Sequence, residues 1–388
     1  MINKINKMMN YMFAKTVDTV IIGAGISGLA CAKKLQENNR DFIIISENIG
    51  GRILTSEDGT VNYGAFFVCS DYTHVLQHVK IKSRIKLNDF CFHNDDTYVF
   101  FAPTFILYAN QFLKTLKLLH KFRRHFRYFR KTCENISQKK SIENDPFLYK
   151  LYMQNAVDFV KEYKLDKGTK KYLSQALYST TFSQIRNMNA FSFLEFLLPL
   201  ITPIYTFKFE KEKMIEPFKE KIVNSSVKNV EYKDGIYKIK YDENIIRAKN
   251  VVLATEITIS KNFAGIKKVN KPVSTNMLHI KGIATTKFSG KIYHLFTPPS
   301  NVQAIADLKD GTYLLYYRNK RPNLNDYFKD PEIIAHHYWS PAGTINGHNL
   351  IESNRGKNLY LIGDYNVAGL EDSFITGVYA ANQIIINK

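Results

Sequence analysis

The sequence predicts an α/β fold with two domains, and three observations support this prediction. The chain has 388 residues, enough for two domains of ordinary size. Near the N-terminus, a short β-branched strand beginning at Thr19 leads through a glycine-rich turn into a helix with apolar residues at helical spacing. Near the C-terminus, residues 358–381 show the same order of strand, glycine turn and helix. Strands that alternate with helices in this way form parallel sheets.

The composition is that of a folded and strongly basic protein. Apolar residues make up 45% of the chain and charged residues 23%, which excludes wholesale disorder. Lys and Arg number 54 against 35 Asp and Glu, so the formal net charge is +19. This charge favours an anionic partner such as nucleic acid, a membrane surface or an acidic substrate. Because no recognised nucleic-acid motif accompanies the charge, we expect no nucleic acid.

Cysteine spacing and hydropathy favour a cytoplasmic protein. The four cysteines form no CxxC pair, which argues against a disulfide framework or a structural zinc site. Residues 1–15 lack the apolar core of a secretory signal, and we expect them to form a frayed leader. The most apolar stretch, residues 191–207, is interrupted by Glu195 and two prolines, so it is not expected to span a bilayer. Peripheral membrane association stays open.

The glycine turn has the spacing of a dinucleotide-binding motif. In Gly23-x-Gly25-x-x-Gly28, the first glycine would permit a tight turn, the second a close approach to a pyrophosphate, and the third close packing of the helix on the strand. The phosphates would lie at the helix N-terminus. A second apolar strand, residues 41–47, ends in Glu47, near the expected spacing for a ribose-binding carboxylate. The complete βαβ unit disfavours a turn without a ligand.

The residues after this unit point to a particular family. Gly51 and Arg52 lie in a Gly-Gly-Arg segment, and Gly64 follows shortly after. Here the sequence resembles the flavin-containing amine oxidase superfamily, which includes monoamine and polyamine oxidases, protoporphyrinogen oxidases and phytoene desaturase-like enzymes. The resemblance implies FAD, with Arg52 and the glycines against its pyrophosphate, ribityl chain and ring. Arginine presents a fork of donors to phosphate, and glycine lets the backbone lie close to the ring.

The resemblance recurs at two later places. Val227 falls at the family's central hairpin, which implies that it holds adenine through its backbone. Gly363 and Asp364 match the closing flavin motif, in which the acid bonds the ribityl chain. Leu370 and Glu371 would begin the last helix, whose N-terminus faces the pyrimidine end of the flavin. A helix N-terminus suits the negative charge of reduced flavin.

Some positions depart from the family pattern. The loop between Glu47 and Gly50 is short, so Ser46 is an alternative to Glu47 for the ribose contact. Gly369 stands where monoamine-type oxidases have a caging aromatic residue, which weakens a simple amine oxidase assignment. No cysteine follows Cys133, so we expect FAD to be bound non-covalently.

The resemblance implies two domains with interleaved segments. A discontinuous, Rossmann-like FAD-binding domain would comprise residues 16–80, 205–265 and 345–388. A mixed α+β substrate domain would comprise residues 81–204 and 266–344.

Within the substrate domain, Lys281 is the candidate catalytic residue. It falls on a strand where many relatives have a lysine that holds a water at flavin N5, although an exposed surface lysine is the alternative. Trp339 would either line the cavity or anchor the core. His336 and His337 have no further ligand at metal spacing, so we expect no metal.

Residues 104–131 are expected to form a basic helical segment. From Phe112 to Lys131 the chain has eight basic residues and no acid, with aromatic and leucine side chains at three-and-four spacing. Such a segment could contact anionic lipid or an acidic partner through residues 112–131. The alternative is an ordinary surface helix whose apolar stripe belongs to the core.

Together these features predict an FAD-dependent oxidoreductase of the amine oxidase type. It would transfer a hydride from a C–H bond of a small-molecule substrate, next to nitrogen or in a C–C unit, to flavin N5. One alternative is a desaturase or protoporphyrinogen oxidase-like enzyme with a lipophilic substrate. Another is a non-catalytic flavoprotein that binds a membrane or a partner.

Overall fold

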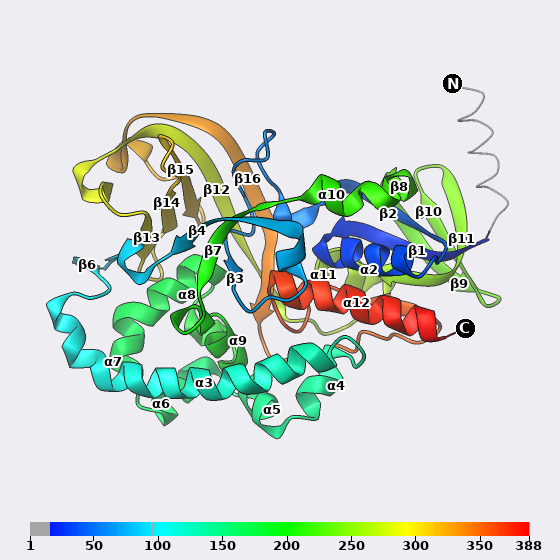
Figure 1. Ribbon diagram of the computed structural model, residues 1–388, viewed down its shortest axis with the longest axis horizontal. Coiled ribbons are helices and arrows are strands. Elements are labelled where there is room, and N and C mark those ends of the chain that lie inside the picture. The colour runs from blue at the N-terminus through cyan, green and yellow to red at the C-terminus, as the bar shows by residue number, and fades with distance from the viewer. Residues whose placement is uncertain (1–15, 95, 388) are drawn as a thin grey trace.

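The computed structural model describes residues 16–94 and 96–387 (Figure 1). Residues 1–15, the expected leader, lie outside the described residues. The described chain folds into two large sheets, a small sheet between them and a group of helices beneath (Figure 1).

The first sheet has the strand order β8-β2-β1-β11-β10-β9, with β17 paired to β11. Its centre is parallel, and β9, β10 and β11 form an antiparallel meander. The central strands are runs of buried Val and Ile, as expected for strands covered on both faces. The strands are β1 (Thr16–Gly25), β2 (Phe42–Gly50), β8 (Ile222–Asn224), β9 (Val227–Lys233), β10 (Ile236–Tyr241), β11 (Asn244–Leu253) and β17 (Leu359–Leu361).

Two helices cover one face of this sheet and cross closely. These are α2 (Ile26–Glu37) and α12 (Leu370–Ile386), which lie against each other in Figure 1. A Cβ atom at Gly377 of α12 would lie 2.1 Å from the carbonyl oxygen of Ser27 in α2, so only glycine allows this approach. The close crossing brings the N-termini of both helices to the same cavity.

The second large sheet has the order β16-β12-β15-β14-β13-β5-β6. The long strands β12 and β16 pair in antiparallel fashion, with Met277 opposite His337 and Thr275 opposite Trp339. The strands are β5 (Phe90–His93), β6 (Thr97–Val99), β12 (Lys271–Ala284), β13 (Tyr293–Phe296), β14 (Val302–Asp307), β15 (Thr312–Tyr317) and β16 (Phe328–Asn346). The small sheet, β3-β7-β4, lies between the two large ones and consists of β3 (Val68–Cys69), β4 (Val79–Ile85) and β7 (Ile204–Phe209).

The strands of the two large sheets come from different parts of the chain. Every strand of the first sheet falls within residues 16–80, 205–265 or 345–388. The strands of the second sheet fall within residues 81–204 and 266–344, apart from the last two residues of β16. The α/β fold with a Rossmann-like domain is thereby confirmed.

A group of helices fills the region between β6 and β7, and α3 runs along its length (Figure 1). The basic segment begins as a 3₁₀ turn, Pro103–Tyr108, so the α-helix starts later than expected. Its aromatic stripe is core, with Phe122 and Phe126 almost fully buried. Among the described residues, no helix is long and apolar enough to cross a membrane. The helices of this group are α3 (Ala109–Thr132), α4 (Gln138–Glu143), α5 (Pro146–Met153), α6 (Ala156–Glu162), α7 (Asp166–Gly168), α8 (Ser174–Thr181) and α9 (Ala190–Glu195), whereas α10 (Lys211–Ile215) and α11 (Ile257–Phe263) follow β7 in the sequence.

Candidate active site

A cavity of about 1460 Å³ lies between the two large sheets. One end is formed by the glycine turn after β1, the loop after β2 and the start of α12. The other end is formed by β13, β14, β16 and helices α8 and α9. The candidate site is therefore built from segments far apart in the sequence.

The glycine turn has the geometry that its spacing predicts. Gly23 has φ +106°, and a Cβ there would lie 2.8 Å from the carbonyl oxygen of Ala254. A Cβ at Gly28 would lie 2.1 Å from the carbonyl oxygen of Gly23, so this glycine sets the helix against the strand. By contrast, no heavy atom lies within 4 Å of a Cβ built at Gly25, which lines the cavity. This open space is a cradle that any larger residue would fill.

The N-terminus of α2 faces this space without a competing anion. Gly25 is its N-cap residue, no side chain caps the helix, and its first turn contains no acid. Ile26 and Ser27 also line the cavity. The free N–H groups and the positive end of the helix dipole can therefore bind a phosphate.

Within β2, the side chain of Ser46 is hydrogen-bonded to the glycine turn. The backbone N–H of Ala24 donates to Ser46 Oγ at 3.1 Å, and Ser46 Oγ donates to the carbonyl oxygen of Asn48. Glu47 is exposed and also lines the cavity. Ser46 and Glu47, the two alternatives for the ribose contact, therefore both line the cavity. Ser46 is the one that is hydrogen-bonded to the glycine turn.

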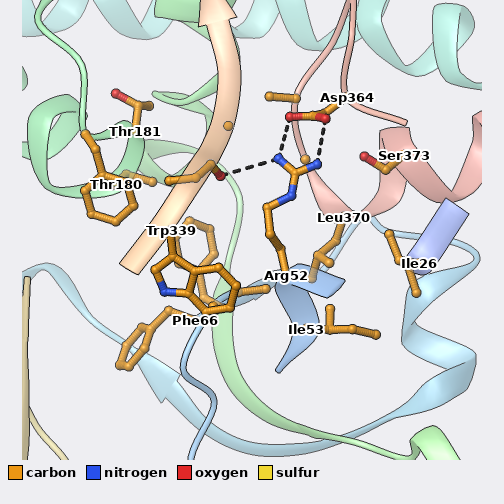
Figure 2. A pocket seen from close by; sticks show the side chains of 18 of the residues that line it. Ile26, Arg52, Ile53, Phe66, Thr180, Thr181, Trp339, Asp364, Leu370 and Ser373 are labelled. Atoms are coloured by element: carbon orange, nitrogen blue, oxygen red, sulfur yellow. Dashed lines mark hydrogen bonds and ion pairs between the residues drawn. The ribbon is translucent and has the colours of Figure 1, made fainter. Parts of the chain in front are cut away.

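Arg52 and Asp364 form an ion pair that faces the cavity (Figure 2). The guanidinium donates to both carboxylate oxygens, at 2.5 and 2.6 Å. The backbone N–H of Thr344 donates to Asp364 at 3.0 Å. Burial alone would raise the pKa of Asp364, but Arg52 outweighs burial and holds this pKa below its ordinary value. Asp364 therefore offers a fixed negative charge.

Two glycines let the chain fold tightly around Arg52. Gly51 has φ +55°, and a Cβ there would lie 3.3 Å from the Cα of Gly25. A Cβ at Gly64 would lie 2.0 Å from the carbonyl oxygen of Arg52. Both glycines line the cavity, so the predicted Gly51, Arg52 and Gly64 come together beside the glycine turn.

The later predicted residues reach the same cavity, with one exception. Val227, Gly363 and Leu370 line it. Glu371 does not, because its carboxylate is fully buried and accepts hydrogen bonds from the backbone N–H groups of residues 73–75 and from the Thr73 hydroxyl. The Glu371 carboxylate is therefore not available to a cofactor in the cavity. It instead ties the first turn of α12 to the loop before Val75.

Lys281 does not belong to the site, and its assignment as the catalytic residue is wrong. It lies on β12 opposite Thr312 and Glu332, is exposed and does not line the cavity. It shares a strand face with Met277, whose side chain is in the core that borders the cavity, but lies four residues farther along. No residue of β12 lines the cavity. Among the described lysines, Lys86 is the one that lines it.

Aromatic and aliphatic side chains form the wall opposite the glycine turn. Figure 2 shows Trp339 and Phe66 on one side of Arg52 and Leu370 on the other. Trp339 thus lines the cavity, as does His337, whereas His336 is exposed. Further apolar members of this wall are Phe67, Phe90, Phe92, Phe100, Tyr172, Phe182, Phe196, Tyr293, Leu295 and Tyr316.

A buried charged group beside Gly369 was missed by the sequence analysis. Arg130 donates to both carboxylate oxygens of Asp372, at 2.9 and 2.7 Å. Glu195 is 8% exposed and lines the cavity, and its Oε2 has no hydrogen-bond partner in the described part of the chain. A Cβ at Gly369 would lie 3.8 Å from Glu195 Oε1. Glu195 therefore borders the space where a side chain at position 369 would stand. The sequence offered one indication of this group, because Glu195 is a single charged residue within the apolar stretch 191–207.

Comparisons with known proteins agree with this geometry. A family model described as an NAD(P)-binding Rossmann-like domain matches residues 21–80. A structure of putrescine oxidase bound to putrescine is similar over 96% of this chain and 100% of its own, with a TM-score of 0.69 and 11% identity.

Two further solved structures show the same similarity. Cyclohexylamine oxidase from Brevibacterium oxydans matches over 96% of this chain and 99% of its own, with a TM-score of 0.65 and 15% identity. A fatty acid isomerase from P. acnes that produces CLA matches over 96% and 98%, with a TM-score of 0.64 and 12% identity. The chain therefore shares the fold of putrescine oxidase and cyclohexylamine oxidase, which is the fold that the sequence resemblance implied.

Proposed function

We propose that this protein is an oxidoreductase that binds FAD non-covalently and takes a hydride equivalent from a C–H bond of its substrate. The observation that carries the proposal is the open cradle at Gly25, which faces the uncapped N-terminus of α2 inside a large cavity. A structural turn has no need of such a space. A pyrophosphate would fill it.

The other residues of the cavity fit the remaining parts of FAD. Asp364 can accept hydrogen bonds from ribityl hydroxyl groups, and Val227 can offer its backbone to adenine. α12 begins at Leu370 without a side-chain cap, so its N–H groups remain available to the polar edge of the ring. Bound FAD would supply an acceptor for two electrons and a proton at N5, a chemistry that amino-acid side chains lack. The aromatic wall would exclude water from the reacting carbon.

The first experiment is an absorption spectrum of the purified protein before and after acid precipitation. Flavin bands that move into the supernatant are the expected result, and a colourless protein that takes up no added FAD would overturn the proposal. Gly25→Val is the matched variant, because a Cβ at this position meets no heavy atom within 4 Å and the valine methyl groups would enter the cradle. It should fold normally, as judged by circular dichroism, and lose the flavin.

The cavity favours an apolar substrate over a cationic amine. Gly369 supplies no caging aromatic ring. Of the two carboxyl groups nearest to it, Asp372 is paired with Arg130, and burial raises the pKa of Glu195 well above its ordinary value. The wall farther from the glycine turn is mostly aromatic and aliphatic. Oxidation of a lipophilic C–C or C–N unit is therefore the second candidate, beside amine oxidation as in the putrescine and cyclohexylamine oxidases.

Anaerobic flavin reduction separates these candidates. Bleaching by monoamines or polyamines would support amine oxidation, and bleaching only by a polyene or a porphyrinogen would support the lipophilic class. A flavin that none of these donors reduces would favour the non-catalytic flavoprotein. Lys281→Met serves as a control for flavin reoxidation by dioxygen, which should be unchanged because Lys281 lies outside the cavity.

We further propose that residues 101–131 contact an anionic membrane surface. Phe101, Ile106, Leu107 and Leu113 are between 57% and 78% exposed, and Phe101 also lines the cavity. Exposed basic side chains continue along α3 at Lys117, Lys121, Arg124, Arg127 and Lys131. Apolar side chains beside a basic helix face suit the headgroup region of an anionic bilayer. A lipophilic substrate could then enter directly from the membrane.

Liposome flotation tests this contact. The double change Ile106→Asp and Leu107→Asp should abolish flotation with vesicles rich in phosphatidylserine. Ile283→Asp is the matched control, because Ile283 is 66% exposed but lies on β12. Equal flotation of both variants and the wild type would overturn the assignment of this surface.

A further inference from the structure

Two neighbouring strands place a cysteine and two histidines together on one face of the second large sheet. β5 and β13 run parallel, with Cys91 opposite His294 and His93 two residues further along β5. Side chains two residues apart share a face of a strand, so the three point to the same side. The residues between them, Phe92 and Leu295, line the cavity on the other side. The cluster therefore lies behind the cavity wall and outside the proposed flavin site.

The three side chains converge at metal-binding distances. Their ligand atoms all lie within 4.8 Å of one another, and His93 Nε2 lies 2.9 Å from His294 Nδ1. Cys91, His93 and His294 are 5%, 6% and 1% exposed. A small cation between these atoms would need only a small adjustment of the side chains, because zinc is bound at about 2.0–2.3 Å by nitrogen and sulfur ligands.

The two histidine rings are hydrogen-bonded to each other through His93 Nε2 and His294 Nδ1, so an ion bound by these atoms would replace that hydrogen bond. His93 Nδ1 is 3.3 Å from the hydroxyl of Thr97, the kind of outer contact that orients a metal-ligating ring. His294 Nε2 is buried and has no hydrogen-bond partner among the described residues. Cys91 is a free, buried thiol beside the two rings. The cluster therefore offers one thiol and two imidazoles as ligands for a metal ion.

The surroundings of the cluster define the kind of ion. The ring of His93 stacks on Phe296 at 4.8 Å and lies 5.1 Å from Phe288. The three donor atoms are nitrogen and sulfur, and Mg²⁺ and Ca²⁺ prefer oxygen ligands, so the cluster disfavours both of these ions. One thiolate and two imidazoles suit zinc, cobalt or copper.

We propose that Cys91, His93 and His294 form a binding site for one thiophilic transition-metal ion of the zinc class. The ion would join β5 to β13, two strands about 200 residues apart in sequence. Because Phe92 and Leu295 alternate with the ligands, it would also fix the wall of the cavity from behind. CxxC spacing could not reveal this site, since its ligands come from different segments.

The test uses the full chain, freed of metal with a chelator and titrated with Co²⁺. The expected result is a thiolate-to-cobalt charge-transfer band in the difference spectrum that saturates at one equivalent, and that Zn²⁺ removes by competition. Cys91→Ser should abolish the band, and His294→Gln should weaken Co²⁺ affinity by roughly 100-fold. Cys133→Ser, another buried cysteine, is the matched control and should bind as the wild type does.

The cobalt band in the wild type and in Cys133→Ser tests the proposal even where another variant fails to fold. If Cys91→Ser does not fold, the band in the wild type and in Cys133→Ser still tests the site. A wild type without a charge-transfer band, or with a band that Cys91→Ser retains, would overturn the proposal. Metal analysis of the protein as purified identifies the native ion, and copper in place of zinc would keep the site and change only its occupant. The result does not depend on flavin binding.

Discussion

Glu195 is a buried carboxyl group whose protonation should depend on folding. Burial first, and then the charge of Asp372, raise the pKa of Glu195 well above its ordinary value, and Arg130 opposes them only in part. Burial also raises the pKa of Asp372, but less than that of Glu195, because Arg130 donates to both oxygens of Asp372 and opposes burial there. The proton is therefore held by Glu195, beside the start of α12 and within the cavity.

This proton predicts a pH-dependent effect of Glu195→Gln. In the unfolded chain Glu195 releases its proton near its ordinary pKa of about 4.3, whereas the folded chain keeps it at higher pH. The wild type therefore loses stability as pH rises above that value, by up to about 1.4 kcal/mol per pH unit, until the folded pKa is reached. Glu195→Gln, which is always neutral, should gain stability relative to the wild type as pH rises above the ordinary pKa of a glutamate.

Urea unfolding at several pH values measures this difference. A constant difference between wild type and Glu195→Gln across the range would contradict the assignment of the proton. Glu371→Gln is the control, because the carboxylate of Glu371 accepts four hydrogen bonds. Replacing it should lower the free energy of unfolding by about 1–3 kcal/mol.

At the scale of single residues, the sequence predicted which positions require glycine better than it predicted where side chains lie in the folded chain. Gly23, Gly25 and Gly28 could be assigned because each has a distinct steric role that spacing reveals. Lys281 could not, because strand alternation sets the face of a side chain but not where a cavity ends. Glu195 was missed because only the folded chain brings α9 beside α12.

At the scale of elements, the crossing of α2 and α12 positions the site. Gly377→Ala would place a Cβ 2.1 Å from the carbonyl oxygen of Ser27 and 2.9 Å from the nitrogen of Cys31. α12 must then move away, which should cost about 1–3 kcal/mol and displace Leu370 from the cavity. Gly25→Ala is the control, because its Cβ meets open space and should leave stability unchanged. Thermal unfolding compares the two variants, and equal losses would contradict this account of the crossing.

Helix α3 shows why an amphipathic pattern alone left two alternatives open. Its aromatic stripe packs into the core, as hydrophobic spacing allows. Its basic residues divide between two roles that the pattern does not separate. Arg123 and Arg130 pair with Asp71 and Asp372, whereas Arg124 is exposed. The acidic partners come from distant segments, so only the tertiary structure distinguishes these arginines.

At the scale of the whole molecule, the cofactor motifs predicted the first sheet far better than the second. Each motif of the first sheet combines a strand with a glycine turn, and parallel pairing then sets their order. The second sheet is held by long antiparallel pairing between β12 and β16, which no local motif marks. The cluster of Cys91, His93 and His294 could not be predicted either, because it forms only when β5 pairs with β13.

Because the candidate FAD site joins three distant segments, ligand binding should stabilise the whole molecule. FAD added to cofactor-free protein at about 100 times its Kd is expected to raise the free energy of unfolding by about 2.7 kcal/mol. Gly25→Val should unfold as the cofactor-free wild type does and gain nothing from FAD, since its side chain occupies the cradle. Lys281→Met should gain as much as the wild type. Denaturant unfolding with and without FAD measures all three, and equal stabilisation of Gly25→Val would mean that FAD does not bind at the glycine turn.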